Sequence, residues 1–128
     1  NKKAQVIDVQ TKFKTQDTAL DMAFLEQQKD LLGPAFDTMI NAYLAGMDQG
    51  VSSMRTALTA GERYELRGHA HKAKSSSLQV GAEGMVERCQ VLEDACLADV
   101  PFASIGSQID QIERVLASVR PILLNVIL

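Results

Sequence analysis

Hydrophobic residues recur every three or four positions along most of the chain, which is the spacing of one face of an α-helix. The spacing predicts one short helix followed by four longer ones. Their approximate ranges are 21–32, 34–58, 62–79, 82–98 and 103–119. Because short connections separate the longer helices, consecutive helices should run antiparallel. We therefore expect an all-α fold, an antiparallel four-helix bundle with a short extra N-terminal helix that covers one end.

Residues at the ends of these stretches support the boundaries. Asp21 is suited to the N-cap of the first helix, and Gly33-Pro34 should end it, with Pro34 in the first turn of the next helix. Gly61 and Gly81 then mark the turns on either side of the third helix of this series. Each connection is therefore expected to be short.

Both ends of the chain depart from the regular pattern. Residues 1–18 are polar and lysine-rich, and we interpret them as a linker or arm, with the domain itself spanning 19–128. Near the other end, Pro121 is expected to kink or end the last helix, because proline lacks a backbone N–H and crowds the preceding turn. The apolar tail 122–128 would then either pack on the bundle or stay exposed, and the sequence leaves both options open.

Composition agrees with a helical domain and excludes several partners. The 128 residues suit one domain, and 46% hydrophobic but only 5% aromatic residues favour helices over a β-sandwich. A net charge of −3 with interspersed signs gives no positive surface for nucleic acid. No apolar run approaches the roughly 20 residues needed to span a bilayer, so we expect no direct membrane contact.

One stretch carries candidate chemistry. It comprises His71, Lys74 three residues later, the small residues 75–77 and Gly81-Ala82, followed downstream by Cys89 and Leu92-Glu93. This pattern resembles the signature of histidine-containing phosphotransfer (HPt) domains, and the resemblance covers about residues 20–120. One position departs from it, because the glycine that usually follows the lysine is Ser75.

The resemblance implies a phosphorelay. Such domains accept a phosphoryl group from an aspartate of one receiver domain and pass it to an aspartate of another, here the receivers of a parent kinase and of a response regulator. The Mg²⁺ that these transfers use belongs to the receiver, so no cofactor is expected in this chain, nor any turnover of its own. The resemblance also implies a position at the C-terminal end of a bacterial hybrid sensor histidine kinase. We expect the domain to be monomeric and cytoplasmic. The parent protein is then a candidate for anchoring in the inner membrane.

Helical geometry gives the candidate residues positions. On the third of the five predicted helices, 62–79, the inward stripe should be Leu66, Ala70, Ala73, Ser77 and Val80. A second stripe, at the boundary between core and solvent, contains Arg67, His71, Lys74, Ser75 and Leu78. His71 should therefore be the accessible phosphoryl acceptor, with Arg67, Ser75 and Leu78 as partner-binding residues.

The hairpin around Gly81 adds a third candidate. His71 lies eleven residues before Ala82 and Glu93 lies eleven after it, so the two should face each other. Glu93 is expected to accept a hydrogen bond from one ring nitrogen and leave the other free to attack phosphorus. Lys74, one turn from His71, is expected to stabilise the added negative charge.

Two other interpretations compete with this one. His69, His71, Cys89 and Cys96 are possible metal ligands, but His-x-His in a helix directs the rings to opposite sides and the cysteines are seven apart. We expect no metal site, a solvated His69, and both cysteines as unpaired core residues in a reducing compartment. The second alternative is a non-catalytic helical docking module, with the apolar stripe and Leu78 as its contact surface.

Overall fold

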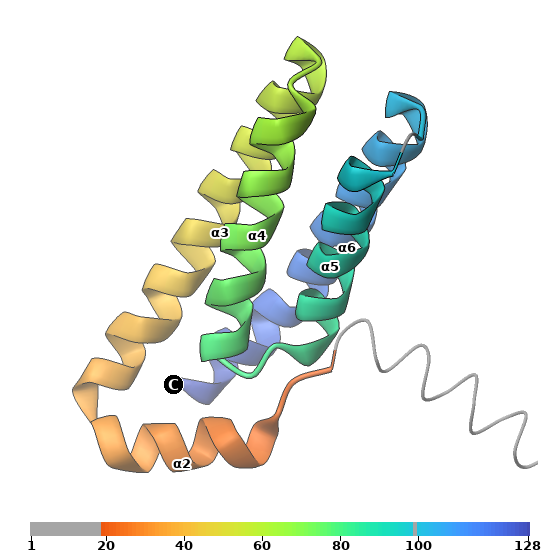
Figure 1. Cartoon of the computed structure of the whole chain (residues 1–128). Helices are drawn as coiled ribbons and strands as arrows, with labels where there is room; N and C mark the ends of the chain where they lie inside the picture. Colours follow the sequence, from red (N-terminus) through yellow and green to blue (C-terminus); the bar gives the residue numbers. More distant parts are fainter. Residues whose placement is uncertain (1–18, 99) are drawn as a thin grey trace, which may run out of the picture.

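The computed structural model describes residues 19–98 and 100–128, so the predicted arm 1–18 lies outside the described residues. Five α-helices and no strand are present in this part of the chain. They are α2 (Met22–Leu32), α3 (Pro34–Ala60), α4 (Arg63–Gln79), α5 (Glu83–Leu97) and α6 (Phe102–Val126). Helices α3 to α6 form an antiparallel four-helix bundle, and α2 lies across its lower end (Figure 1). The predicted fold class is confirmed.

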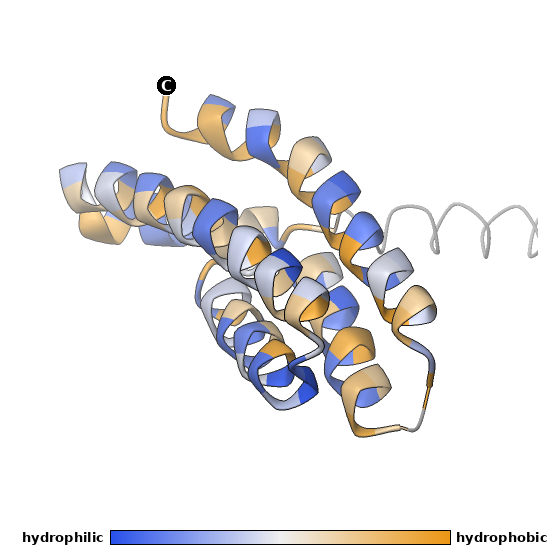
Figure 2. Ribbon diagram, turned by 90° about the horizontal axis from the view of Figure 1, so that it is seen from above, coloured by the Kyte–Doolittle hydropathy of each residue, from blue (hydrophilic) through white to orange (hydrophobic). Residues whose placement is uncertain are grey.

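The core lies between the four long helices. Helix α3 packs against α4 and α6, and α5 packs against the same two helices. Hydrophobic residues alternate with hydrophilic ones along each helix (Figure 2), as burial of one face requires. The largest fully buried side chains are Leu25, Phe36, Ile40, Met47, Met54, Leu66, Met85, Leu92, Ile105, Ile109, Ile112 and Leu123. Burial of each such side chain stabilises the fold by about 1.5–3 kcal/mol relative to exposure.

Helix α4 contributes small residues to this core. Ala70, Ala73 and Ser77 are all buried. The small side chains allow neighbouring helices to approach closely. The Ser77 hydroxyl lies 2.8 Å from the Tyr43 hydroxyl of α3, a buried hydrogen bond between the two helices. Burial raises the pKa of Tyr43 to about 12, so the phenol stays protonated and available for this bond.

Helix α2 is fixed to the bundle by backbone contacts at the α4–α5 turn. Asp21 caps α2 by accepting a hydrogen bond from Phe24 N at 2.9 Å. The Asp21 N–H donates to Gly81 O at 2.9 Å, and the Gly84 N–H donates to Ala19 O at 3.2 Å. These bonds confirm the predicted N-cap and the predicted position of the short helix.

The opposite end of the α4–α5 hairpin is fixed by one arginine. Arg63, at the start of α4, donates hydrogen bonds to the carbonyl oxygens of Ala95, Ala98 and Val100, at 3.3, 3.0 and 2.6 Å. Its guanidinium also lies 4.7 Å from the centroid of the Phe102 ring. Carbonyls at the end of α5 have no partner within the helix, so a cation there is favourable. The hairpin is thus held at both ends.

The last helix is longer than its sequence pattern predicts. It continues through Pro121 to Val126, and Leu123 and Val126 are buried in the core. Pro121 is exposed, and so is Ala117, the residue whose carbonyl would otherwise accept the missing hydrogen bond. Burial of the tail's apolar side chains offsets the lost bond. The tail therefore packs on the bundle, and Lys29 of α2 donates a 2.7 Å hydrogen bond to Val126 O.

The α4–α5 turn should tolerate no side chain at Gly81. Its φ is +70°, and an added Cβ would lie 3.1 Å from the Phe24 ring and 3.2 Å from Asp21 Cβ. Gly61 has φ +69° but no atom within 4 Å of an added Cβ. We expect Gly61→Ala to lower the free energy of unfolding by about 1–2 kcal/mol, from the left-handed backbone alone. Gly81→Ala should cost clearly more in urea unfolding, and equal losses would show that α2 does not pack tightly on this turn.

Candidate functional site

His71 lies in the middle of α4 with its ring largely in solvent. The side chain is 63% exposed, and Nδ1 lies 3.3 Å from both carboxylate oxygens of Glu93 on α5. The hairpin prediction that these residues face each other is therefore correct. A nitrogen facing a carboxylate carries the ring proton, so Nδ1–H donates and Nε2 keeps its lone pair. The structure presents a nucleophilic nitrogen on an accessible surface.

Glu93 is the only charged residue that is buried among those the structure describes, and it has two partners. Its side chain is only 7% exposed, and Lys74 Nζ lies 2.7 Å from its Oε1. Lys74 also donates to Gln90 Oε1 at 2.9 Å, and Gln90 Nε2 donates to Asp94 Oδ1 at 2.9 Å. A buried carboxylate is stable only when paired and hydrogen-bonded. Lys74 therefore supports Glu93, which in turn orients His71.

The charge of Glu93 follows from these contacts. Burial on its own raises the pKa of the carboxyl group, but the hydrogen bonds from Lys74 and His71 outweigh it and lower the pKa below the ordinary value of 4.5. Glu93 is thus ionised at neutral pH. The two 3.3 Å distances to His71 are long for a hydrogen bond to a charged group, whereas the contact with Lys74 is short. The lysine is the stronger of the two partners.

Lys74 has partners that its spacing in the sequence does not reveal. From sequence position, its ammonium is expected one turn from His71, where it would stabilise a phosphoryl group. In the structure the ammonium is bound to Gln90 and to Glu93 Oε1, the same oxygen that faces His71 Nδ1, and the lysine side chain is only 18% exposed. A phosphoryl group on His71 would compete with Glu93 for it. Gln90 was not among the predicted site residues, although it lies on the same face of α5 as Glu93, one turn earlier.

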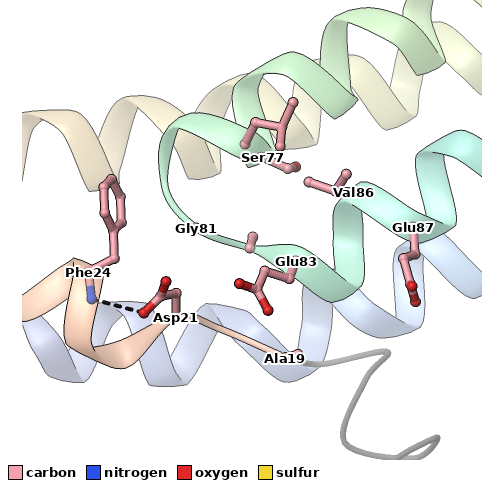
Figure 3. Close-up of a pocket in the computed structure, with 10 residues that line it drawn as sticks. Ala19, Asp21, Phe24, Ser77, Gly81, Glu83, Val86 and Glu87 are labelled. Carbon is pink, nitrogen blue, oxygen red and sulfur yellow. Dashed lines mark hydrogen bonds between the residues drawn. The ribbon is translucent and has the colours of Figure 1, made fainter.

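The three predicted partner-binding residues share the surface of α4 with His71. Arg67 is half-buried, Ser75 is exposed, and Leu78 is 60% exposed. Beyond Leu78, a cavity of about 340 Å³ lies at the α4–α5 turn, between Asp21 and Phe24 on one side and Ser77 and Val86 on the other (Figure 3). Its lining is Ala19, Asp21, Phe24, Ser77, Leu78, Gly81, Ala82, Glu83, Val86 and Glu87. The exposed stripe thus leads from the histidine to a hollow at the end of the helix.

The rival metal ligands lie elsewhere. Cys89 and Cys96 are free and buried in the core, and burial raises the pKa of Cys89 to about 12. His69 is half-buried and lines a separate polar hollow with Glu62 and Glu65. No group of three His, Cys, Asp or Glu residues suited to a metal ion occurs among the residues that the structure describes.

A family model described as Hpt domain matches residues 38–121, a range that contains His71, Lys74 and Glu93. The chain belongs to the Hpt domain family. Hpt domains carry out phosphotransfer through a histidine in two-component signalling and interact with receiver domains. This membership argues against a helical module that only docks.

The bundle also resembles a solved structure. The crystal structure of histidine-containing phosphotransfer protein B from Pseudomonas aeruginosa PAO1 aligns with a TM-score of 0.75 and 24% sequence identity. The alignment covers 83% of this chain and 91% of that chain, and it shows that the fold is shared. No curated protein matched the sequence. Within the described residues of this Hpt domain, none of the helices is both long and apolar enough to cross a membrane.

The lowered pKa of Glu93 predicts a pH-dependent stability. Since the folded state binds this proton more weakly than the unfolded state, the contribution of Glu93 is fully present above about pH 4.5 and is lost as the pH falls through the lower folded value. Glu93→Gln should lower the free energy of unfolding by about 1–3 kcal/mol at pH 7. The gap to wild type should shrink below pH 4.5.

Glu26→Gln is the matched control for this measurement. Glu26 is an exposed glutamate of α2, far from the site in the sequence, so its substitution should change stability by less than about 0.5 kcal/mol at any pH. Chemical unfolding at several pH values measures both variants. A Glu93→Gln gap that stays constant down to pH 3 would contradict the assignment of an ionised, hydrogen-bonded Glu93.

Proposed function

We propose that this domain is a phosphorelay intermediate in which His71 Nε2 accepts a phosphoryl group from a receiver-domain aspartate and passes it to an aspartate of a response regulator. The observation that carries this proposal is the pairing of an exposed His71 ring with a buried, ionised Glu93 at Nδ1. The pairing keeps the lone pair on the nitrogen that faces solvent.

The reaction balances with the groups at hand. The Nε2 lone pair attacks the phosphorus of the aspartyl phosphate, the N–P bond forms, and the P–O bond to the aspartate breaks. The aspartate leaves as a carboxylate, while Nδ1 keeps its proton, so the ring becomes positively charged. Glu93 offsets that charge with its own negative charge across the 3.3 Å contact. Transfer to the second aspartate is the reverse of this step.

His71 needs a surface that the partner's active site can reach more than it needs catalytic groups from its own domain. Phosphoryl transfer depends chiefly on positioning and on charge stabilisation around the phosphoryl oxygens. The partner's active site supplies the attacking or leaving carboxylate, and we propose that it also supplies the Mg²⁺. On this account the domain has no cofactor and no turnover of its own.

The contact surface for the receivers is proposed to be the stripe from Arg67 through Ser75 to Leu78. Ser75 keeps the surface beside the ring low, because its side chain is small, although larger than the usual glycine. Leu78 offers an exposed apolar side chain that a partner can cover. Both receivers would use this one face in turn, since each must reach the same nitrogen.

The parent protein is proposed to be a bacterial hybrid sensor histidine kinase that carries this domain at its C-terminal end, in the cytoplasm. The partners would then be the receiver of that kinase and a separate response regulator, each binding a monomeric Hpt domain. The family membership of residues 38–121 supports the part of this proposal that concerns receiver domains as partners. The predicted arm 1–18 would connect the bundle to the preceding part of the kinase.

The proposal is tested by direct transfer. A phosphorylated receiver domain incubated with the protein should give a label that is acid-labile and base-stable, as a phosphoramidate is. His71→Gln should carry none, while His69→Gln should be labelled as well as wild type, because that ring points away from the site. Label in His71→Gln, or none in wild type, would overturn the proposed function.

Glu93 should affect the rate of transfer more than the fold. Glu93→Ala removes a charged hydrogen-bond partner of the ring, so transfer should slow by about 10- to 100-fold. Circular dichroism should still show a helical bundle. A transfer rate equal to that of wild type would remove Glu93 from the mechanism.

Leu78 should affect affinity for the receiver. Leu78→Glu places a charge where an apolar contact is proposed, so binding should weaken by about tenfold. Leu31→Glu is the control, because Leu31 is 77% exposed but lies on α2, outside the stripe. Isothermal titration with the receiver compares the two variants, and equal losses would exclude a specific role for Leu78.

A further inference from the structure

A hollow adjoins His71 on the side that faces the start of α4. It has a volume of about 250 Å³ and is lined by Tyr64, Arg67, Gly68 and His71. A methyl group in place of the Gly68 hydrogen would meet no atom within 4 Å, so the space beside this residue is open. Helical side chains lean toward the N-terminus of their helix. The His71 ring therefore extends over the turn that this hollow occupies.

Arg67 is the cation of this hollow. Its Nε is buried and makes no hydrogen bond, and no carboxylate forms an ion pair with its guanidinium, among the residues that the structure describes. A buried donor without a hydrogen-bond partner destabilises the fold, so such groups are rare in native structures unless they serve another purpose. Arg63, the other arginine of this end of α4, is occupied by the carbonyls at the end of α5.

The charges around His71 indicate what Arg67 could bind. Lys74 and Glu93 form an ion pair, so their charges cancel next to the ring. Phosphorylation adds a charge of about −1.5 to −2 at the ring nitrogen. Among the side chains that line the hollow with His71, only Arg67 brings a positive charge. A guanidinium can donate two parallel hydrogen bonds to phosphoryl oxygens.

We infer that Arg67 binds the phosphoryl group carried by His71. The phosphoryl group would occupy the hollow between Tyr64, Gly68 and His71. Arg67 then acts on the phosphorylated state itself and not only on contact with a receiver. Lys74 remains with Glu93 and keeps the ring oriented. This inference rests on the proposed function, because it requires His71 to be phosphorylated, and it assigns the site that holds the product.

A measurement without any receiver separates this role from partner docking. Potassium phosphoramidate phosphorylates histidine directly, and ³¹P NMR then follows the titration of the phosphoryl group. A cation next to the phosphoryl oxygens favours their more negative form. Arg67→Gln should therefore raise the titration midpoint by about 0.5–1 pH unit relative to wild type. Arg67→Lys, which keeps the charge, should recover at least half of that difference.

Lys72→Gln is the matched control. The substitution removes one positive charge, as Arg67→Gln does, at the residue that follows His71. Lys72 is exposed, and its side chain points about 100° away from that of His71 around the helix. Its midpoint should stay within about 0.2 units of wild type, because exposed charges are strongly screened. Equal shifts in Arg67→Gln and Lys72→Gln would overturn the inference.

Two further observations keep the outcomes distinct. In wild-type protein, the Arg67 Nε–H resonance should shift and its exchange with water should slow on phosphorylation, a readout that does not depend on the folding of a variant. An unchanged resonance would also overturn the inference. Absence of an acid-labile label on His71 in wild type, with either phosphoramidate or a receiver, would instead mean that the proposed function fails.

Discussion

The register of α4 against α5 is the constraint on which the site depends. His71 and Glu93 are 22 residues apart in sequence and belong to different helices, so a slip of one residue between the helices would separate them. Gly81 fixes the register at one end, through its left-handed backbone and its contact with α2. Arg63 fixes it at the other end, where it binds the last carbonyls of α5. Small residues on α4 let the two helices approach closely enough for the side chains to meet.

Electrostatic interactions then fix the orientation and the tautomer of the His71 ring. A carboxylate with 7% of its side chain exposed is unfavourable unless it is compensated, and Lys74 supplies that compensation at 2.7 Å. The compensated Glu93 retains its charge and accepts a hydrogen bond from the ring. A buried ion pair thus serves to hold an exposed imidazole ring in one tautomer. A purely structural bundle would have no need of this, since an apolar residue at the same place would stabilise the fold as well or better.

Much of this could be predicted from the sequence, because it depends on backbone geometry. Counting eleven residues outward in each direction from Ala82 was enough to place Glu93 opposite His71, and the cap at Asp21 marked the start of α2. The partners of the Lys74 ammonium could not be predicted, because this long side chain can reach several groups and only the packing of the helices selects among them. The continuation of α6 through Pro121 also depends on tertiary structure. The missing hydrogen bond falls on the solvent side, while Leu123 and Val126 gain burial.

The buried, unsatisfied Nε of Arg67 could likewise not be predicted from the sequence, which placed Arg67 on the same stripe as His71 but only as a partner-binding residue. The burial of this atom depends on how α4 packs against its neighbours. Whether Glu93 holds Nδ1 and leaves Nε2 to react can be measured by ¹⁵N NMR of the ring of His71. We expect the Nδ1–H tautomer in the free protein and a ³¹P–¹⁵N coupling to Nε2 after phosphorylation. A proton on Nε2 in the free protein, or a phosphoryl group on Nδ1, would contradict this expectation.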